Sequence, residues 1–343
     1  MGRITLKELA ALAGVDKSVA SKVANGLSAP ASAEKISRVQ ALMHEHGYVP
    51  LSAARSLARR RNQRIGFLLS ANTSLGFANE VYARMLCGSL AVCQAQGYQC
   101  LADSWDFLRL TDLQLPENIL GRSVDGFILT GGVSDAMLDA IRSFALPFVA
   151  ISGERLRGSV PVFSWDTAVI SREVLEYCRS LNHRRIWYCT TQRLGRENLE
   201  RQLASFPDLR VEILSRTDPT SAEALAKTCT RRYCQLPPAE RPTFVFGASV
   251  FCCALANELS AQGYRCPQDI SLLGSHDNTL AQYYHPGLTT ISENYSRLGQ
   301  LAAETLLAML SGKLNHSQAI QQSQSHTNTH YWSFRASTRA IDV

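Results

Sequence analysis

The sequence predicts an α/β core of two doubly wound parallel-sheet subdomains, preceded by an all-α helix-turn-helix headpiece at the N-terminus. Two observations support this prediction. Residues 5–26 have the pattern of two short helices joined by a tight turn, and from Arg64 onward short apolar runs alternate with amphipathic stretches. Alternation of this kind is typical of parallel sheets that helices cover on both faces. A chain of 343 residues is long enough for two or three domains with a substantial core.

The first predicted helix begins at a capping box and ends at a glycine. The side chains of Thr5 and of Glu8, three residues later, can each accept a hydrogen bond from a backbone N–H that the start of a helix leaves free. Gly14 can adopt the left-handed conformation that ends a helix. Small and apolar residues recur on one face of this segment, namely Leu6, Leu9, Ala10 and Ala13. The segment therefore has a start, a buried side and an end.

The second predicted helix has an apolar back and a cationic front. We expect Asp16 to cap its N-terminus. The side chains expected to point inward are Val19, Val23 and Ala24, and those expected on the opposite face are Lys17, Ser18, Ser21, Lys22 and Asn25. Such a helix, crossed by a preceding helix through a glycine turn, is the arrangement that places its second helix in the major groove of DNA.

Positive charge is concentrated at the N-terminus. Residues 1–61 contain ten Lys or Arg and four acidic residues, a net charge of +6, which is also the formal net charge of the whole chain. The other 282 residues are therefore neutral overall. Any single lysine could simply lie on a solvated surface. A positive field confined to one small segment, however, is what neutralisation of DNA phosphates requires.

A third helix completes the headpiece, which we assign to residues 1–50. It is predicted from its cap Ser32 to His46, with Ile36, Val39 and Met43 facing inward and Gly47 ending it. Residues 51–61 have helix propensity but few apolar side chains. We interpret them as a hinge that folds only against DNA and a partner copy. Residues 62–343 form the predicted core.

Seven apolar runs are the clearest predicted strands of this core: Ile65–Leu69, Val124–Thr130, Pro147–Ser152, Arg185–Thr190, Val211–Leu214, Thr243–Gly247 and Ile270–Gly274. Roughly ten strands are expected in total, which indicates two subdomains rather than one. Ligands of such sheets bind at the carboxyl ends of the strands. A cleft between the two subdomains is therefore the expected ligand site.

The sequence carries no pattern that indicates export, membrane insertion, a metal site or a cofactor. The first apolar stretch is interrupted by Lys7 and Glu8, and no run of about 18 apolar residues occurs. Ten cysteines are scattered without a Cys-x-x-Cys pair or zinc-type spacing to histidine. We expect a cytoplasmic protein with reduced, mostly buried cysteines. Adjacent Cys252 and Cys253 are expected to serve as small apolar side chains.

Several short motifs follow one another along the chain in a recognisable order. In the headpiece and hinge they are the Thr5-Leu6 start, Ala13-Gly14-Val15, Ser21-Lys22-Val23 with Asn25, Gly47-Tyr48-Val49-Pro50 and Ala54-Arg55-Ser56-Leu57. In the core they are Val124-Asp125-Gly126, residues 182–186, residues 267–271, residues 286–291 and residues 334–339. In order and spacing, these motifs resemble the lactose/galactose-repressor (LacI/GalR) family of bacterial transcription regulators over nearly the full chain.

The resemblance implies a homodimer that binds double-stranded operator DNA, with a core like that of periplasmic sugar-binding proteins. It implies an N-subdomain of about residues 62–160 and 293–325, and a C-subdomain of about residues 161–292 and 326–343. No heptad helix follows Arg339, so a dimer is the expected endpoint. The residues expected to contact DNA are Thr5, Leu6, Lys17, Ser18, Ser21, Lys22, Asn25, Ser52, Ala54, Arg55 and Leu57. Leu57 is expected to enter the minor groove, the alternative being that it packs on its own headpiece.

The expected effector site departs from the family pattern. Ala248-Ser249 stands where the family has an Asn-Asp pair, His276 where it has an acidic residue, and Ser152 where an acidic or other polar residue is common. Because carboxylates accept hydroxyl protons, these changes remove much of the usual sugar recognition. Arg196 and protonated His276 could bind an anion instead; alternatively, both simply pair with surface acids. We expect no effector, or one unlike a typical neutral sugar. The expected lining residues are Asn72, Phe77, Thr130, Ser152, Arg196, Ser249 and His276.

Three other functions need separate consideration. A regulator whose core serves only dimerisation fits the same motifs, and a solute-binding protein would share the core but would need export. An enzyme could use His276 and Asp277, together with Ser249 or one of the cysteines, as a triad. Neighbouring residues on a loop rarely face one another, however, and no Gly-x-Ser-x-Gly motif is present. The sequence favours a sequence-specific DNA-binding repressor without catalytic residues, metal or cofactor.

Overall fold

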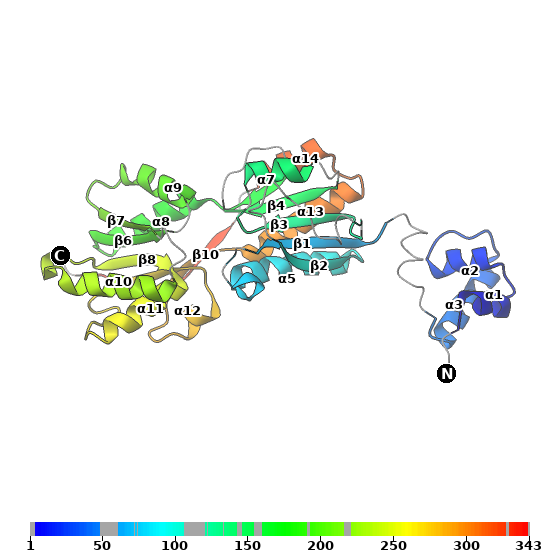
Figure 1. Ribbon diagram of the computed structural model, residues 1–343, viewed down its shortest axis with the longest axis horizontal. Helices are drawn as coiled ribbons and strands as arrows, with labels where there is room; N and C mark the ends of the chain where they lie inside the picture. Colours follow the sequence, from blue (N-terminus) through cyan, green and yellow to red (C-terminus); the bar gives the residue numbers. More distant parts are fainter. Residues whose placement is uncertain are drawn as a thin grey trace.

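The structure, a computed structural model, consists of a three-helix headpiece and two α/β lobes that follow one another along its long axis (Figure 1). It describes residues 4–48, 61–71, 73, 75–105, 121, 123–132, 134–142, 146–153, 160–190, 193–215, 221–326 and 329–341. The predicted fold class is confirmed, because two mainly parallel sheets form the core behind a helical N-terminal unit. Within the described residues, no helix is both long and apolar enough to cross a membrane.

The headpiece contains α1 (Leu6–Ala13), α2 (Lys17–Ala24) and α3 (Ala33–Glu45). Its buried apolar core consists of Leu9, Ala13, Val23 and Val39. The predicted capping box of α1 is confirmed, since Thr5 and Glu8 each donate a backbone N–H to the other's side chain. Gly14 ends the helix at φ 62°. Local signals in the sequence therefore correctly indicate where these helices begin and end.

Two expectations for α2 are wrong. Asp16 occupies the N-cap position, but its side chain makes no capping hydrogen bond. Asn25 is only 4% exposed, because its amide turns back and donates to the carbonyl of Ser21 at 2.7 Å. Asn25 therefore completes the C-terminal end of α2 instead of extending the exposed polar face.

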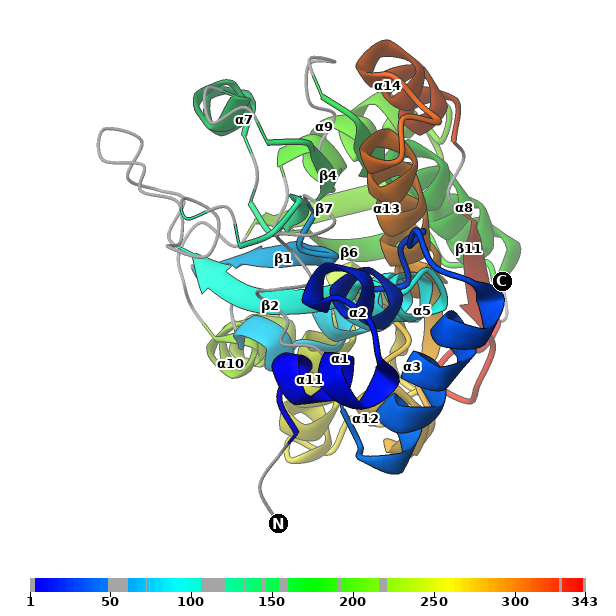
Figure 2. The same ribbon diagram turned by 90° about the vertical axis from the view of Figure 1, so that its right-hand side faces the viewer.

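The first lobe is built on five parallel strands in the order β2-β1-β3-β4-β5. They are β1 (Arg64–Ser70), β2 (Gln99–Trp105), β3 (Gly126–Thr130), β4 (Phe148–Ser152) and β5 (Val162–Ser164). Helices α5 (Glu80–Ala95) and α13 (Tyr295–Leu310) cover one face, and α7 (Asp135–Arg142) covers the other, as Figure 2 shows. Along β1, Phe67 packs toward α5 and α13 while Leu68 packs toward α7, as the alternation of a strand requires.

The second lobe is built on six strands in the order β11-β10-β9-β8-β6-β7, all parallel except the β10–β11 pair. They are β6 (Arg185–Thr190), β7 (Arg210–Ser215), β8 (Phe244–Ala248), β9 (Ser271–Ser275), β10 (Thr289–Glu293) and β11 (His330–Ser333). The helices are α8 (Thr167–Ser180), α9 (Arg193–Leu203), α10 (Ala222–Gln235), α11 (Ser249–Ser260) and α12 (Thr279–Tyr283). All ten cysteines are free and six are buried, Cys252 and Cys253 on α11 among them.

The chain passes between the lobes three times: from β5 to α8, from β10 to α13, and from α14 (His316–Ser325) to β11. The strand β5 lies beyond the boundary predicted at about residue 160 and still belongs to the first sheet, because it pairs with β4. The prediction had used apolar runs, and three residues are too short a run to detect.

Helices α5 and α13 cross at very short distance. A Cβ on Gly88 would lie 2.0 Å from the carbonyl oxygen of Ser296, and one on Gly299 would lie 1.9 Å from that of Met85. Only glycine permits this approach at both positions. The crossing places the first residue of α13, Tyr295, in a defined position relative to α5 and to the loop after β9.

Candidate functional site

The exposed face of α2 carries Lys17, Ser18 and Lys22. Ser21 is half-buried beside them. Thr5 is exposed at the start of α1, whereas Leu6 packs against the headpiece core and has only part of its surface free. The face of α2 therefore combines two long cations and two hydroxyls without an acidic side chain. The predicted hinge contacts Ser52, Ala54, Arg55 and Leu57 lie outside the described residues.

The residues predicted to line the effector site from the first lobe are mostly buried. Thr130 is 1% exposed, and its hydroxyl contacts the Met85 sulfur at 3.6 Å. Ser152 is also buried. Phe77 is half-buried and packs against Phe67, with ring centroids 6.2 Å apart. Asn72 lies outside the described residues. Thr130 therefore belongs to the core in this structure, which corrects its predicted role as a residue that lines the cleft.

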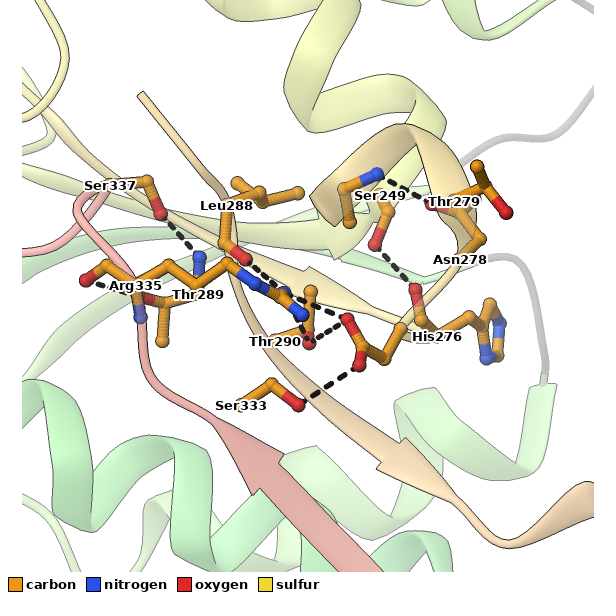
Figure 3. A network of polar contacts seen from close by, with 12 residues as sticks. Ser249, His276, Asn278, Thr279, Leu288, Thr289, Thr290, Ser333, Arg335 and Ser337 are labelled. Carbon is orange, nitrogen blue, oxygen red and sulfur yellow. Dashed lines mark hydrogen bonds and ion pairs between the residues drawn. The ribbon is translucent and has the colours of Figure 1, made fainter. Parts of the chain in front are cut away.

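Ser249, predicted to contact an effector, instead holds the loop after β9. Its one hydroxyl proton is shared between the main-chain carbonyls of Ser275 at 2.7 Å and His276 at 2.8 Å. Figure 3 shows the contact with His276. A Cβ on Gly274 would lie 2.4 Å from the Ser249 oxygen, so a glycine is needed there for Ser249 to approach. Because the hydroxyl proton is already used within the protein, Ser249 holds this loop in place and has no proton left to donate to an effector.

His276 lies on this loop in an unusual backbone conformation, with φ at 68°. Its Nδ1 contacts the hydroxyl of Tyr295, which donates to Glu293. Burial is the main cause that lowers the pKa of His276; the nearby Glu293 opposes it and Arg84 adds to it. A left-handed backbone is costly for a residue with a Cβ, and it persists here because Ser249 holds both adjoining carbonyls.

Arg196 and His276 do not form the cationic pair that the sequence suggested. Arg196 lies on α9 and pairs with Glu200 one turn further along at 2.9 Å, with half of its side chain exposed. His276 faces Tyr295 and Glu293, and its lowered pKa favours the neutral ring at pH 7. Arg196 therefore pairs with a surface acid, as the alternative expected, whereas His276 is a neutral ring whose hydrogen-bond partner is Tyr295. The two positive charges that would attract an anionic effector are not assembled.

A buried ion pair beside His276 was missed by the sequence analysis. Asp277 bonds to Arg335 at 2.7 Å and accepts hydrogen bonds from Thr290 and Ser333, each at 3.0 Å (Figure 3). Burial alone would raise the pKa of Asp277, but these donors outweigh it and the pKa is lowered. The pair ties the loop after β9 to the C-terminal segment that follows β11.

The geometry contradicts the triad that an enzyme would need. The Asp277 carboxylate is occupied by Arg335, Thr290 and Ser333, and the Ser249 hydroxyl donates to carbonyls. Neither of them is bonded to the His276 ring, so the general base and nucleophile are not assembled.

In the part of the chain that the structure describes, no group of three or more His, Cys, Asp or Glu side chains could hold a metal ion.

Comparison with known proteins agrees with this architecture. Residues 175–338 match a family model described as a periplasmic binding protein-like domain. The chain is 28% identical to the ribose operon repressor of Haemophilus influenzae, covering 88% of this chain and 91% of that protein. It is also 28% identical to the HTH-type transcriptional regulator CelR of Thermobifida fusca, covering 91% of this chain and 93% of that protein.

A solved structure of the Lac repressor dimer, bound to operator and an anti-inducer, superposes with a TM-score of 0.79 at 20% identity. It covers 99% of this chain and 100% of that chain. The proteins to which the chain is similar are transcription regulators, the Lac repressor among them, in agreement with the resemblance of the sequence to the LacI/GalR family. The chain itself combines three N-terminal helices with a periplasmic-binding-protein-like core, and the relatives are named as a repressor and a regulator rather than as enzymes.

Proposed function

We propose that this chain is a homodimeric repressor of the LacI/GalR type that binds a pseudo-palindromic operator, with an affinity that responds to a small-molecule effector. The observation that carries the proposal is the exposed face of α2, with Lys17, Ser18 and Lys22, on a compact helical unit that precedes a two-lobed core. The ribose operon repressor, which is similar to this chain over most of its length, is named as a repressor.

Base reading is assigned to the first two turns of α2. Side chains near the start of a recognition helix reach base edges in the major groove, and a long cation can donate to guanine O6 and N7. Lys17, Ser18 and Lys22 occupy these positions without an acidic neighbour on the same face. The net charge of +6 in residues 1–61 supplies the attraction to phosphates that sequence-independent binding needs.

Dimerisation is assigned to the second lobe, where apolar side chains are left exposed. Val250 on α11 is 46% exposed, and Leu280 and Tyr283 on α12 are 44% and 82% exposed. Large apolar groups on adjoining helices favour an isologous interface with a second copy. Two copies related by a two-fold axis would present two headpieces to a palindromic site.

Effector control is assigned to the loop after β9 and the facing elements of the first lobe. The loop follows the carboxyl end of a parallel strand, which is where ligands of such sheets bind. One solved structure with the same fold is a complex of the transcriptional regulator CelR with cellobiose, at a TM-score of 0.65 and 22% identity. The competing proposal is a regulator that no effector controls and whose core serves only for dimerisation.

The test of the main proposal is selection of DNA by the full chain from a library of random duplexes, followed by mobility shift. An inverted repeat with two half-sites is expected, together with tight binding to the selected duplex and weak binding to a scrambled one. Recovery of DNA without sequence preference would contradict operator binding.

Dimerisation is tested separately by sedimentation. Tyr283→Asp places a charge in the proposed interface and is expected to convert the dimer to a monomer. Gln262→Asp places the same charge on an exposed residue just after α11 and serves as the control. A wild-type monomer, or a Tyr283→Asp variant that remains a dimer of unchanged affinity, would exclude this interface.

A further inference from the structure

A chain of three polar groups runs from the buried end of β10 to the exposed side of the loop after β9. Tyr295 donates its hydroxyl to Glu293 Oε2, and its oxygen contacts His276 Nδ1. Tyr295 is 2% exposed and the Glu293 side chain 8%. The His276 side chain, by contrast, is 37% exposed. One end of the chain is therefore a buried carboxylate, and the other is an imidazole that solvent can reach.

The direction of the first hydrogen bond determines the second. A tyrosine hydroxyl has a single proton, and Tyr295 gives it to Glu293. The Tyr295 oxygen can then only accept from His276, so the proton of the imidazole must lie on Nδ1. A neutral imidazole carries one ring proton, which leaves Nε2 with a free lone pair.

The surroundings keep the His276 ring neutral and the arrangement rigid. Burial lowers the pKa of His276, and burial together with the charge of Glu293 raises the pKa of Tyr295 well above its usual value. The ring of Tyr295 packs edge-on against Trp165 with centroids 5.8 Å apart, and it lies 5.5 Å from the ring of His276. The backbone of His276 is held by Ser249. Within the described residues, Nε2 has no hydrogen-bond partner.

We infer that Glu293 and Tyr295 are positioning residues that present His276 Nε2 as a hydrogen-bond acceptor for a neutral donor group, such as a hydroxyl, on the effector. This inference rests on the proposed effector control. His276 Nε2 would take the place of one of the hydroxyl acceptors that the family pattern has and this sequence lacks. At neutral pH a carboxylate has no proton to donate, and the negative charge of a carboxylate or a phosphate would face a lone pair backed by Glu293. The ligand class is therefore a neutral, hydroxyl-bearing molecule.

The tautomer can be observed without any ligand. Nitrogen NMR of the full chain with labelled histidine distinguishes protonated from unprotonated ring nitrogens, and His276→Phe identifies the signal of His276 among the eight histidines. We expect a protonated Nδ1 and an unprotonated Nε2 at pH 7. Tyr295→Phe should remove this preference. Tyr188→Phe, which removes another buried hydroxyl whose partner is Ser171, should leave it unchanged. A proton on Nε2 in the wild type, or a charged ring, would overturn the inference.

Binding is then measured by thermal shift and calorimetry with three probes: cellobiose, D-ribose and inorganic phosphate. We expect one of the neutral sugars to raise the melting temperature and phosphate to leave it unchanged. His276→Phe should weaken the sugar's Kd roughly tenfold, as expected for one lost hydrogen bond, and Tyr295→Phe should weaken it by about threefold. Tyr188→Phe is again the control.

The outcomes separate this inference from the proposed function. Stabilisation by phosphate alone would overturn the ligand class. A sugar that binds and changes operator affinity while His276 carries its proton on Nε2 would leave effector control standing and refute the role of Glu293 and Tyr295. Failure of all three probes would count against both effector control and the ligand class, and the tautomer would still be decided by NMR.

Discussion

Arg84 on α5 donates a hydrogen bond of 2.6 Å to the main-chain carbonyl of Asp277, across from the first lobe to the second. The same guanidinium contacts Glu80 at 3.3 Å, and Glu80 accepts the backbone N–H of Thr279 at 3.1 Å. Two side chains of one helix therefore hold both ends of a short loop in the other lobe. Since His276 immediately precedes Asp277, any change in the spacing of the lobes acts directly on the candidate effector site.

Arg84→Ala should weaken the contact between the lobes. We expect the free energy of unfolding to fall by about 1 kcal/mol, as for one lost hydrogen bond to a charged donor that is partly screened by solvent. The radius of gyration in small-angle scattering should rise. Arg172→Ala is the matched control, because Arg172 is about half exposed and pairs only weakly, with Glu176 of its own helix at 3.9 Å. Equal scattering and equal stability of the two variants would show that Arg84 does not hold the lobes together.

Lys22→Ala should reduce both affinity and selectivity for the operator. A lysine that donates to a base edge contributes about 1 to 3 kcal/mol on the best site and sets the preference at one position of each half-site. Mobility shifts on the selected operator and on single-base variants measure both effects. Lys313→Ala removes the same charge from the core and should change neither. A uniform loss on all sequences would make Lys22 a phosphate contact instead.

Leu57→Ala should abolish bending of the operator. Leu57 lies outside the described residues, and its expected insertion into the minor groove is a prediction from the resemblance. Energy transfer between dyes at the two ends of the duplex reports the bend, and specific binding should weaken with it. The thermal stability of the chain without DNA should stay the same. If the melting temperature falls instead, Leu57 packs against its own headpiece.

Stability should fall as the pH drops from 7.5 to 5 because of His183. This residue is 1% exposed, and burial lowers its pKa to about 4. Below the unfolded pKa of about 6.5, the unfolded chain takes up a proton that the folded ring does not, so stability is present above pH 6.5 and is lost as the pH falls. The expected loss at pH 5 is roughly 2 kcal/mol from this one residue.

Urea unfolding of the wild type and of His183→Gln at both pH values measures this contribution. The variant loses the hydrogen bond that the ring donates to the Arg339 carbonyl and the one that it accepts from the Thr243 hydroxyl, so its stability is lower at either pH. The quantity that tests the prediction is the change between the two pH values, which should be smaller by about 2 kcal/mol in the variant. An equal change in both proteins would show that His183 titrates normally.

Much of the core could be predicted because its buried parallel strands are continuous apolar runs. Each of the seven predicted runs overlaps a strand, with ends that differ by at most two residues. The missed strands lack that signal. Strand β2 lies at the edge of its sheet and is partly exposed. Strand β10 is wholly buried but largely polar in sequence. Its burial is possible because the Thr289 hydroxyl donates to the Arg335 carbonyl and the Thr290 hydroxyl donates to Asp277. A polar buried strand cannot be distinguished from a loop by composition.

The sequence by itself determined the headpiece, the alternating core and the position of the candidate effector loop. Their signals are local: a capping box, a glycine and an apolar period all act within a few residues. Only the tertiary structure decided what individual polar side chains do. Ser249 and His276 are 27 residues apart and meet because β8 and β9 are neighbours. Tyr295 reaches His276 because α13 starts where it crosses α5 at Gly88. A hydrogen bond between distant residues depends on how whole elements pack, and no local propensity encodes that packing.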